Sequence, residues 1–329
     1  MRRREFIILL GGTAVAWPTT ARAQQPERMR RIGVLMPLAQ SDGEAQRRIA
    51  TFGQSLSELG WTEGRNIALE VRYADGDPRR LPALAKELVE AKVDLIITQA
   101  AEPVNAARSA TDTIPIVMAA HGDAVGAGVV ASLARPGGNV TGQTLVATEQ
   151  AAKRLDLIKK VNPAARRVAV LWSGNAAGHR LQMQAMELAA PVLGIALQSL
   201  PTRVPSEIDA ALQAAIEARA QFLVTMDDPF IQSNRARIAE FGLRQRLPVV
   251  GEFRVFVEAG ALLSYAPDQI DLWRSAATYV DRIFRGAKPA DLPVQQPSKF
   301  ELVINLRTAK SLGITIPPGL LAIADEVIE

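Results

Sequence analysis

The sequence predicts an α/β protein built from two Rossmann-like lobes, each with a parallel sheet. Short apolar runs alternate with longer amphipathic segments along almost the whole chain, which is the order of a parallel sheet covered by helices. The pattern also repeats. RRVAVLW at 166–172 resembles RRIGVLM at 30–36, and EARAQFLVTMDDP at 217–229 resembles EAKVDLIITQAAEP at 90–103. Because the two matches occur in the same order, they indicate two similar lobes.

The elements of the first lobe follow from the same alternation. We expect strands at 31–36, 67–73, 93–98 and 114–119, and helices at 44–59, 80–91 and 102–110. Gly60 stands directly after the first of these helices, at the position where glycine commonly ends a helix. This βαβαβ order predicts a parallel sheet with helices on both faces.

Residues 1–23 are typical of an export signal that is cleaved, not of an element of the fold. Arg2–Arg4 precede an apolar run from Phe6 to Trp17, and the run is followed by an A-x-A cleavage pattern at 21–23. The run is too short to cross a ~30 Å hydrocarbon core, so we expect no stable membrane insertion after cleavage. The order RREFI resembles a twin-arginine signal, and an ordinary Sec signal is the alternative.

Composition limits the compartment and the partners. The signal holds four arginines and one glutamate, so its removal lowers the net charge from +4 to +1. No stretch of the remaining chain gathers Lys and Arg into a stripe that follows a phosphate backbone, and we expect no nucleic-acid partner. The chain has no cysteine, which excludes disulfides and a lipid anchor on cysteine. We therefore predict a periplasmic protein that is not a lipoprotein.

Several enzyme classes lack their motifs in this sequence. The segment after the first strand, 36–43, holds one glycine where a dinucleotide fingerprint needs three, and no Walker A lysine is present, so no cofactor is expected. His121 and Asp123 are suited to a general base and its orienting acid, but no G-x-S-x-G or H-E-x-x-H motif accompanies them. An exported enzyme that uses His121 and Asp123 in a cleft between the lobes is the alternative to a binding protein, and no metal site is predicted.

Longer stretches resemble one family. RRIGVLMPLA, LSELGWTEGRNIALEVRYADG, RPGGNVTG, SYAPD and the C-terminal AATYVDRIFRGAKPADLPVQQPSKFELVINLRTAKSLGITIPP are similar to the periplasmic substrate-binding proteins of ABC transporters that include tryptophan- and tyrosine-binding members. The resemblance covers essentially the whole chain. It implies a type I periplasmic-binding fold, in which a three-segment hinge joins two lobes that trap a small molecule and deliver it to an ABC permease. It implies no enzymatic activity.

The resemblance and the repeat together predict the division of the chain. We expect the N-terminal lobe to comprise residues 30–141 and 267–294, and the C-terminal lobe to comprise 144–262 and 298–329. The hinge crossings are expected at 139–144, 263–267 and 293–299. Three short crossings allow the lobes to close on a ligand.

Candidate ligand-binding residues are polar or aromatic and lie in the loops after strands or in the hinge, because ligands of open parallel sheets bind beyond the carboxyl ends of the strands. The resemblance implies a hydrophobic or aromatic amino acid as one ligand class. The candidates are the hydroxyls of Ser41, Thr98, Thr141 and Ser264 for a carboxylate, the acids Asp123, Asp227, Asp228 and Glu252 for an ammonium, and Gln99, His121, Asn175 and Tyr265 for other contacts, with Trp172 and Phe253 as further aromatic candidates.

Some of these residues have a structural alternative. Asp228 precedes Pro229 and is equally suited to cap a helix, and Glu252 is suited to the first turn of a helix. Asn175 is typical of a turn, and aromatic residues at strand ends are more often core. Gln99 and Glu102 are unfavourable to an anion at the start of the following helix. The sequence therefore leaves open whether a carboxylate binds elsewhere or the ligand is not a standard amino acid.

Overall fold

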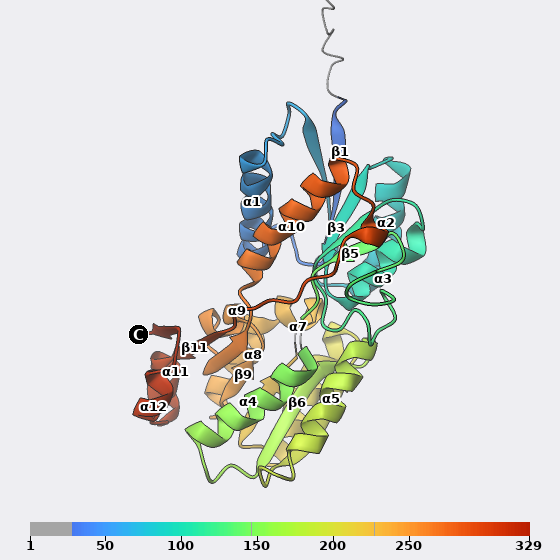
Figure 1. Cartoon of the computed structure of the whole chain (residues 1–329). Helices are drawn as coiled ribbons and strands as arrows, with labels where there is room; N and C mark the ends of the chain where they lie inside the picture. The colour runs from blue at the N-terminus through green and yellow to red at the C-terminus, as the bar shows by residue number, and fades with distance from the viewer. Residues whose placement is uncertain (1–27, 146, 227) are drawn as a thin grey trace, which may run out of the picture.

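The computed structural model describes residues 28–145, 147–226 and 228–329. The predicted export signal and the candidate Asp227 therefore lie outside the described residues. Two sheets, each with helices on both faces, are arranged along the long axis of the molecule (Figure 1). We call the five-stranded sheet with its helices the N-terminal lobe, and the seven-stranded sheet with its helices the C-terminal lobe. The predicted α/β class with two parallel-dominated sheets is confirmed.

The N-terminal lobe has the strand order β2-β1-β3-β4-β5, and every pair is parallel. The strands are β1 (Arg30–Met36), β2 (Ile67–Tyr73), β3 (Leu95–Gln99), β4 (Ile116–Ala120) and β5 (Val140–Gly142). Helices α1 (Gly43–Glu58) and α10 (Gln269–Phe284) pack on one face, and α2 (Leu81–Glu90) and α3 (Ala101–Ala110) pack on the other. Each predicted strand and helix of this lobe is present, with ends shifted by no more than two residues.

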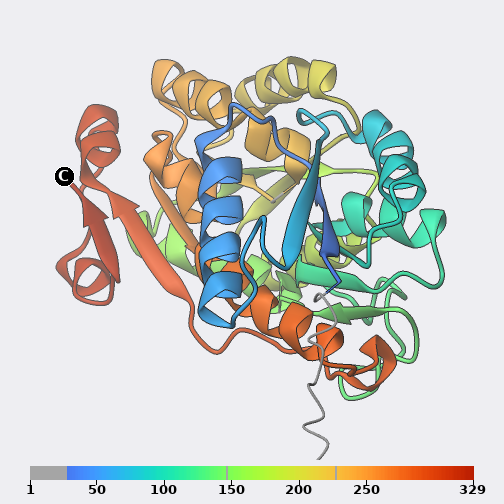
Figure 2. The ribbon, with the colours of Figure 1, turned by 90° about the horizontal axis from the view of Figure 1, so that it is seen from above.

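Helix α10 comes from a late part of the chain and packs beside α1 (Figures 1 and 2). The two helices meet through apolar side chains: Phe52 of α1 lies edge-on against Trp273 of α10, with ring centroids 5.9 Å apart. Both aromatic side chains are completely buried, and an edge-to-face pair adds to the stabilisation by burial. The contact ties residues 269–284 to the N-terminal lobe.

The C-terminal lobe has the order β12-β11-β10-β9-β8-β6-β7. The strands are β6 (Arg167–Ser173), β7 (Ala196–Thr202), β8 (Phe222–Thr225), β9 (Val249–Gly251), β10 (Leu263–Ala266), β11 (Glu301–Asn305) and β12 (Glu326–Ile328). Its first five strands in chain order, β6 to β10, repeat the order of the N-terminal sheet, because β6 and β8 stand where β1 and β3 stand. These are the strands of the sequence repeat. The pairing of β10 with β11 is antiparallel.

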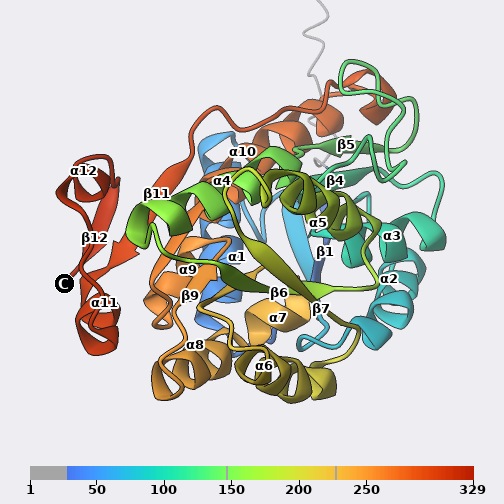
Figure 3. The same cartoon turned by 90° about the horizontal axis from the view of Figure 1, so that it is seen from below.

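Helices cover both faces of this sheet. Helices α4 (Ala147–Val161) and α5 (Ala177–Ala189) lie on one side, and α6 (Ile208–Glu217) and α8 (Arg235–Arg244) lie on the other (Figure 3). The short helices α7 (Pro229–Ser233) and α9 (Arg254–Glu258) follow β8 and β9. At the sheet edge, α11 (Leu306–Leu312) and α12 (Pro318–Leu321) lie with β11 and β12 beside the rest of the lobe (Figure 2).

The chain passes from one lobe to the other after β5, after β10 and before β11. Gly142 ends β5 with φ +129°, and a Cβ at this position would lie 2.2 Å from the backbone oxygen of Met118. Only glycine fits such a close approach of two backbones. Among the described residues, no helix is both long enough and apolar enough to span a bilayer.

Candidate functional site

A cavity lies between the two lobes, at the carboxyl ends of their strands. The space between its walls is about 460 Å³, part of which is open to solvent. Its walls are small and apolar residues with a few polar side chains between them. The lining residues are Gln99, Ala100, Ala101, Ala120, His121, Gly122, Asp123, Leu145, Ala176, Gly178, His179, Gln182, Glu252 and Phe253.

Four residues of the candidate set line this cavity together: Gln99, His121, Asp123 and Glu252. Gln99 is the last residue of β3, His121 follows β4, and Glu252 follows β9. Strand ends of both lobes therefore bring together side chains that are far apart in the sequence, as expected for parallel sheets. Phe253 is the aromatic candidate that contributes to the wall.

The candidate hydroxyls lie elsewhere. Thr98 Oγ1 donates to the Leu35 carbonyl and Thr141 Oγ1 donates to the Leu292 carbonyl, each at 2.7 Å. These bonds hold neighbouring backbone segments together inside the N-terminal lobe. Ser41 is exposed in the turn before α1, and Ser264 is buried in β10 outside the cavity wall.

The remaining candidates also lie outside the cavity wall. Asp228 is the N-cap of α7 and accepts a hydrogen bond from the Phe230 amide at 3.1 Å, as its structural alternative predicts. Asn175 is exposed and donates to the Arg203 carbonyl at 3.0 Å. Tyr265 stacks on Phe300 with centroids 5.9 Å apart. The Trp172 indole donates to Ser199 Oγ at 2.9 Å.

Two helix N-termini form part of the cavity wall, one from each lobe. Helix α3 starts directly after Gln99 and Ala100, and α5 starts directly after Ala176. Both N-cap residues are alanines, so neither helix has a side-chain cap. The first backbone N–H groups of a helix have no acceptor within it, and they carry the positive end of the helix dipole. The arrangement favours an anionic group in the cavity.

His121 is the titratable group most affected by this environment. Its side chain is 1% exposed, and neither ring nitrogen has a hydrogen-bond partner among the described residues. Burial lowers the pKa of His121 from 6.5 to about 4; Asp123 opposes this shift, and His179 and Arg108 add to it. The imidazole is therefore neutral at pH 7, with one N–H donor and one acceptor nitrogen to offer a ligand.

This shift predicts a pH-dependent stability. The unfolded chain protonates His121 below about pH 6.5, whereas the folded protein does so only below about pH 4, so the unfolded state binds more protons between these values. The contribution of His121 to the free energy of unfolding should fall as the pH drops from 6.5 to 4, by up to about 1.4 kcal/mol per pH unit. Urea unfolding at several pH values measures it. His121→Gln should flatten the slope in this range, and an unchanged slope would contradict the assignment.

Glu252 lies in the cavity wall beside a buried arginine that the sequence analysis missed. Arg154 of α4 is completely buried, and its guanidinium lies 3.5 Å from Glu252 Oε2. Burial of two charges is tolerated when they pair with each other. Because the carboxylate is paired in this way, its negative charge is less of an obstacle to an anionic ligand.

Leu145, His179 and Gln182 were also missed as lining residues. His179 and Gln182 are three residues apart on α5, which places them on the same helix face. The sequence held a signal for His179 and Gln182, because their helix begins just after β6, the strand that repeats β1 in the sequence. Leu145 gave no signal, since an apolar residue in a crossing segment looks like core.

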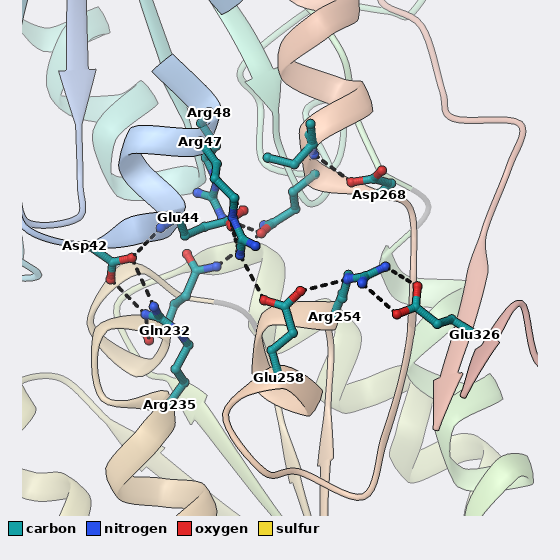
Figure 4. A network of polar contacts seen from close by, with 12 residues as sticks. Asp42, Glu44, Arg47, Arg48, Gln232, Arg235, Arg254, Glu258, Asp268 and Glu326 are labelled. Atoms are coloured by element: carbon teal, nitrogen blue, oxygen red, sulfur yellow. Dashed lines mark hydrogen bonds and ion pairs between the residues drawn. The ribbon is translucent and has the colours of Figure 1, made fainter. Parts of the chain in front are cut away.

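Ion pairs also join the lobes outside the cavity (Figure 4). Arg235 of α8 binds both oxygens of Asp42 at 2.8 and 3.0 Å, and Arg47 of α1 binds Glu258 of α9 at 2.9 Å. Burial acts to raise the pKa of Asp42, but hydrogen bonds from Arg235 and from the Glu44 amide outweigh it and leave the pKa lowered. The structure therefore has its lobes in direct contact across the cleft.

Comparison of the sequence with models of protein families identifies the family of this chain. The model of the ABC transporter substrate binding protein family matches residues 32–328. The chain belongs to this family. The substrate-binding protein is 27% identical over 263 residues to the tyrosine-binding protein of Clostridioides difficile (strain R20291), a match that covers 80% of this chain and 75% of the relative.

Solved structures of similar proteins support the assignment to this family. A domain from Streptococcus pneumonia in complex with L-Trp has 27% identity and a TM-score of 0.84, with 91% of this chain and 100% of the other covered. A conserved domain protein from Vibrio cholerae has 28% identity and a TM-score of 0.85 over the same shares. The fold of the substrate-binding protein is that of the type I periplasmic binding proteins, as the sequence resemblance implied.

Proposed function

We propose that this substrate-binding protein captures an aromatic amino acid, or a related aromatic carboxylate, and passes it to an ABC permease from the periplasm. The observation that carries the proposal is the convergence of two uncapped helix N-termini on a largely apolar cavity between the lobes. The helix termini suit a carboxylate, and the apolar wall suits a ring. Tyrosine and tryptophan are also the molecules named for two of the relatives.

The carboxylate is assigned to the start of α3. Ala101 and Glu102 are the first two residues of this helix, and their N–H groups have no acceptor within it. The Glu102 carboxylate is turned to another partner, because Ser173 Oγ donates to its Oε1 at 3.0 Å. The side chain that made an anion unfavourable in the sequence thus binds the other lobe.

The ammonium and the ring are assigned to the rest of the wall. Gln182 is 3% exposed and its Oε1 has no hydrogen-bond partner among the described residues, so it offers an acceptor to an ammonium. Asp123 supplies a negative charge on the same wall. Phe253 and Leu145 provide apolar surface for an aromatic side chain. An amino acid would then contact both lobes at once.

Binding drives transport by closing the lobes. We assign residues 30–141 and 267–294 to one moving lobe and 144–262 and 298–329 to the other, with hinge crossings at 139–144, 263–267 and 293–299. The two separate sheets and the packing of α10 on α1 support this division. A ligand that touches both lobes binds the closed form better than the open form, and this difference shifts the equilibrium. The permease recognises the closed form.

The alternative, an enzyme that uses His121 and Asp123, has less support. No serine, threonine, cysteine or lysine is among the described residues that line the cavity, so the commonest nucleophiles are missing there. His121 has the geometry of a ligand contact, since both its nitrogens face no protein partner. We therefore assign no catalytic activity to the cavity.

Calorimetric titration tests this function. The chain without residues 1–23 is titrated with L-tryptophan, L-tyrosine and L-phenylalanine, with L-leucine, L-glutamate and glucose as comparisons. We expect micromolar or tighter binding of at least one aromatic amino acid, about −8 kcal/mol or better, with recovery of the unchanged compound. Binding of none of the aromatic acids would contradict the ligand class, and recovery of an altered compound would support the enzyme alternative.

A further inference from the structure

Gln99 stands at the cavity wall with its amide group held in one orientation. Its Oε1 accepts a hydrogen bond from Trp273 Nε1 at 2.5 Å and a longer one from Arg48 at 3.4 Å. An indole N–H and a guanidinium can only donate, so the atom that faces them must be the amide oxygen. A flipped amide would direct its own N–H groups at two donors. The contacts therefore leave no ambiguity between the oxygen and the nitrogen of Gln99.

The two donors are themselves fixed by burial. Trp273 and Arg48 are both completely buried, in the helices α10 and α1. Arg48 Nε donates to Glu44 Oε1 at 3.0 Å, which pairs its charge, and another of its nitrogens donates to Gln269 Oε1. Neither donor is able to turn away without leaving a buried polar group unsatisfied, which costs free energy.

The NH₂ group of Gln99 is consequently the part that faces the cavity. Among the described residues it makes no hydrogen bond, and it is not sealed in the protein interior. The next residue, Ala100, has φ +73°, a conformation that alanine rarely adopts, and its amide donates to the Ala120 carbonyl at 2.9 Å. This backbone bend brings the start of α3 beside the Gln99 amide. Gln99 and Ala101 both line the cavity, so the Gln99 NH₂ and the first amide of α3 lie near each other in its wall.

We infer that Gln99 is a specificity residue that selects a ligand with a carboxylate, which accepts a hydrogen bond from the Gln99 NH₂. Arg48 and Trp273 are positioning residues that fix the orientation of the Gln99 amide. The inference rests on the proposed function and names the contact that distinguishes the acid from its neutral amide. A carboxylate accepts a hydrogen bond from the Gln99 NH₂ through either of its oxygens, whereas a carboxamide in one of its two orientations places its own N–H groups against the Gln99 NH₂. A carboxamide also carries no negative charge to interact with the helix N-termini.

The positioning contacts extend to the other lobe. Gln269 Oε1, which accepts from Arg48, also accepts from Gln232 Nε2 of α7 in the C-terminal lobe at 3.1 Å. All four side chains, Gln99, Arg48, Gln269 and Gln232, are at least 95% buried. The contact between Gln232 and Gln269 exists only when the lobes are together. Gln232 therefore stabilises closure without touching the cavity.

Titration with matched pairs of ligands tests the inference. The probes are L-tryptophan, L-tyrosine and L-phenylalanine, each with its carboxamide, and the readout is the ratio of affinities for acid and amide. Gln99→Glu keeps an oxygen for Trp273 and Arg48 but replaces the NH₂ by a second oxygen. We expect it to lower the affinity for the acid about 100-fold and to change the affinity for the amide much less, so that the ratio reverses. Trp273→Phe should lower the ratio about 10-fold, because it removes the shorter of the two hydrogen bonds that fix the Gln99 amide.

Gln232→Leu is the matched control. It removes a buried amide from the same set of contacts but none that faces the cavity, so it should weaken acid and amide alike and leave their ratio unchanged. If the wild-type protein binds one of the acids and neither Gln99→Glu nor Trp273→Phe changes the ratio, Gln99 is not the specificity residue, and the proposed function stands. If the wild-type protein binds none of the acids, the proposed function and this inference fail together. Trp273→Phe keeps the test valid if Gln99→Glu does not fold.

Discussion

Replacement of Arg154 by methionine is expected to lower the free energy of unfolding by about 3–5 kcal/mol, because it breaks a buried ion pair by removing one of its two charges. Arg154 is completely buried and Glu252 is 3% exposed, with 3.5 Å between the guanidinium and Oε2. Methionine has a similar length and fills the space of the side chain. Urea unfolding at pH 7, followed by circular dichroism, measures the loss.

The double variant Arg154→Met/Glu252→Gln isolates the role of charge. With both charges removed, we expect it to be more stable than Arg154→Met alone, because the buried negative charge of the ion pair is removed together with the positive one. A loss of less than about 1 kcal/mol in Arg154→Met, or a double variant less stable than the single one, would contradict the ion pair as the source of the effect.

Replacement of Gly76 by alanine is expected to weaken ligand binding about 10- to 100-fold by preventing full closure. Gly76 lies in the turn after β2 of the N-terminal lobe, and its missing Cβ would lie 2.5 Å from Oγ and 2.8 Å from Cβ of Ser233 in α7 of the C-terminal lobe. A rotation of the serine hydroxyl does not relieve the contact between the two Cβ atoms, so the lobes must separate. Calorimetry with the aromatic acid that binds the wild-type protein gives the change.

Gly64 provides a control with the same backbone conformation. Its φ is +76° against +73° for Gly76, but no atom lies within 4 Å of the Cβ it would gain. Gly64→Ala therefore carries the same strain of about 1 kcal/mol or more, without a clash between the lobes. We expect its ligand affinity to stay within about twofold of the wild type. Equal losses of affinity in the two variants would show that strain in the lobe, and not closure, is responsible.

Much of the fold was predictable from the sequence because local patterns carry it. The alternation of apolar runs and amphipathic segments gave the strands and helices of the N-terminal lobe, and the repeat of RRIGVLM in RRVAVLW marked β1 and β6, which hold equivalent places in the two sheets. The antiparallel pairing of β10 with β11 had no local signal, since it depends on where the chain returns from the other lobe.

The cavity was predictable only in part. Gln99 ends a strand, His121 and Glu252 follow strands, and the rule that ligands bind at the carboxyl ends of strands identified them. The rule also selected Thr98 and Thr141, whose hydroxyls bind backbone carbonyls within the lobe. Sequence position places a residue near a strand end but does not say whether its side chain faces the cavity or the neighbouring strand.

The polar residues that support the cavity were not predictable. Arg48 and Arg154 lie on helices, where an arginine is usually solvated, and both are completely buried. Their partners Gln99 and Glu252 are 51 and 98 residues away in the chain, and no motif links such positions. Only the packing of α1 and α4 against their lobes brings these charges beside the cavity.

A crystal structure of the chain with a bound aromatic amino acid tests the central claim most directly. We predict that the ligand occupies the cavity bordered by Gln99, His121 and Phe253, with its carboxylate within hydrogen-bond distance of the Gln99 Nε2 and of the amides of Ala101 and Glu102. The contact between Asp42 and Arg235 should be present in the same crystal. A ligand bound outside this cavity, or one that leaves the start of α3 without a carboxylate partner, would contradict the account.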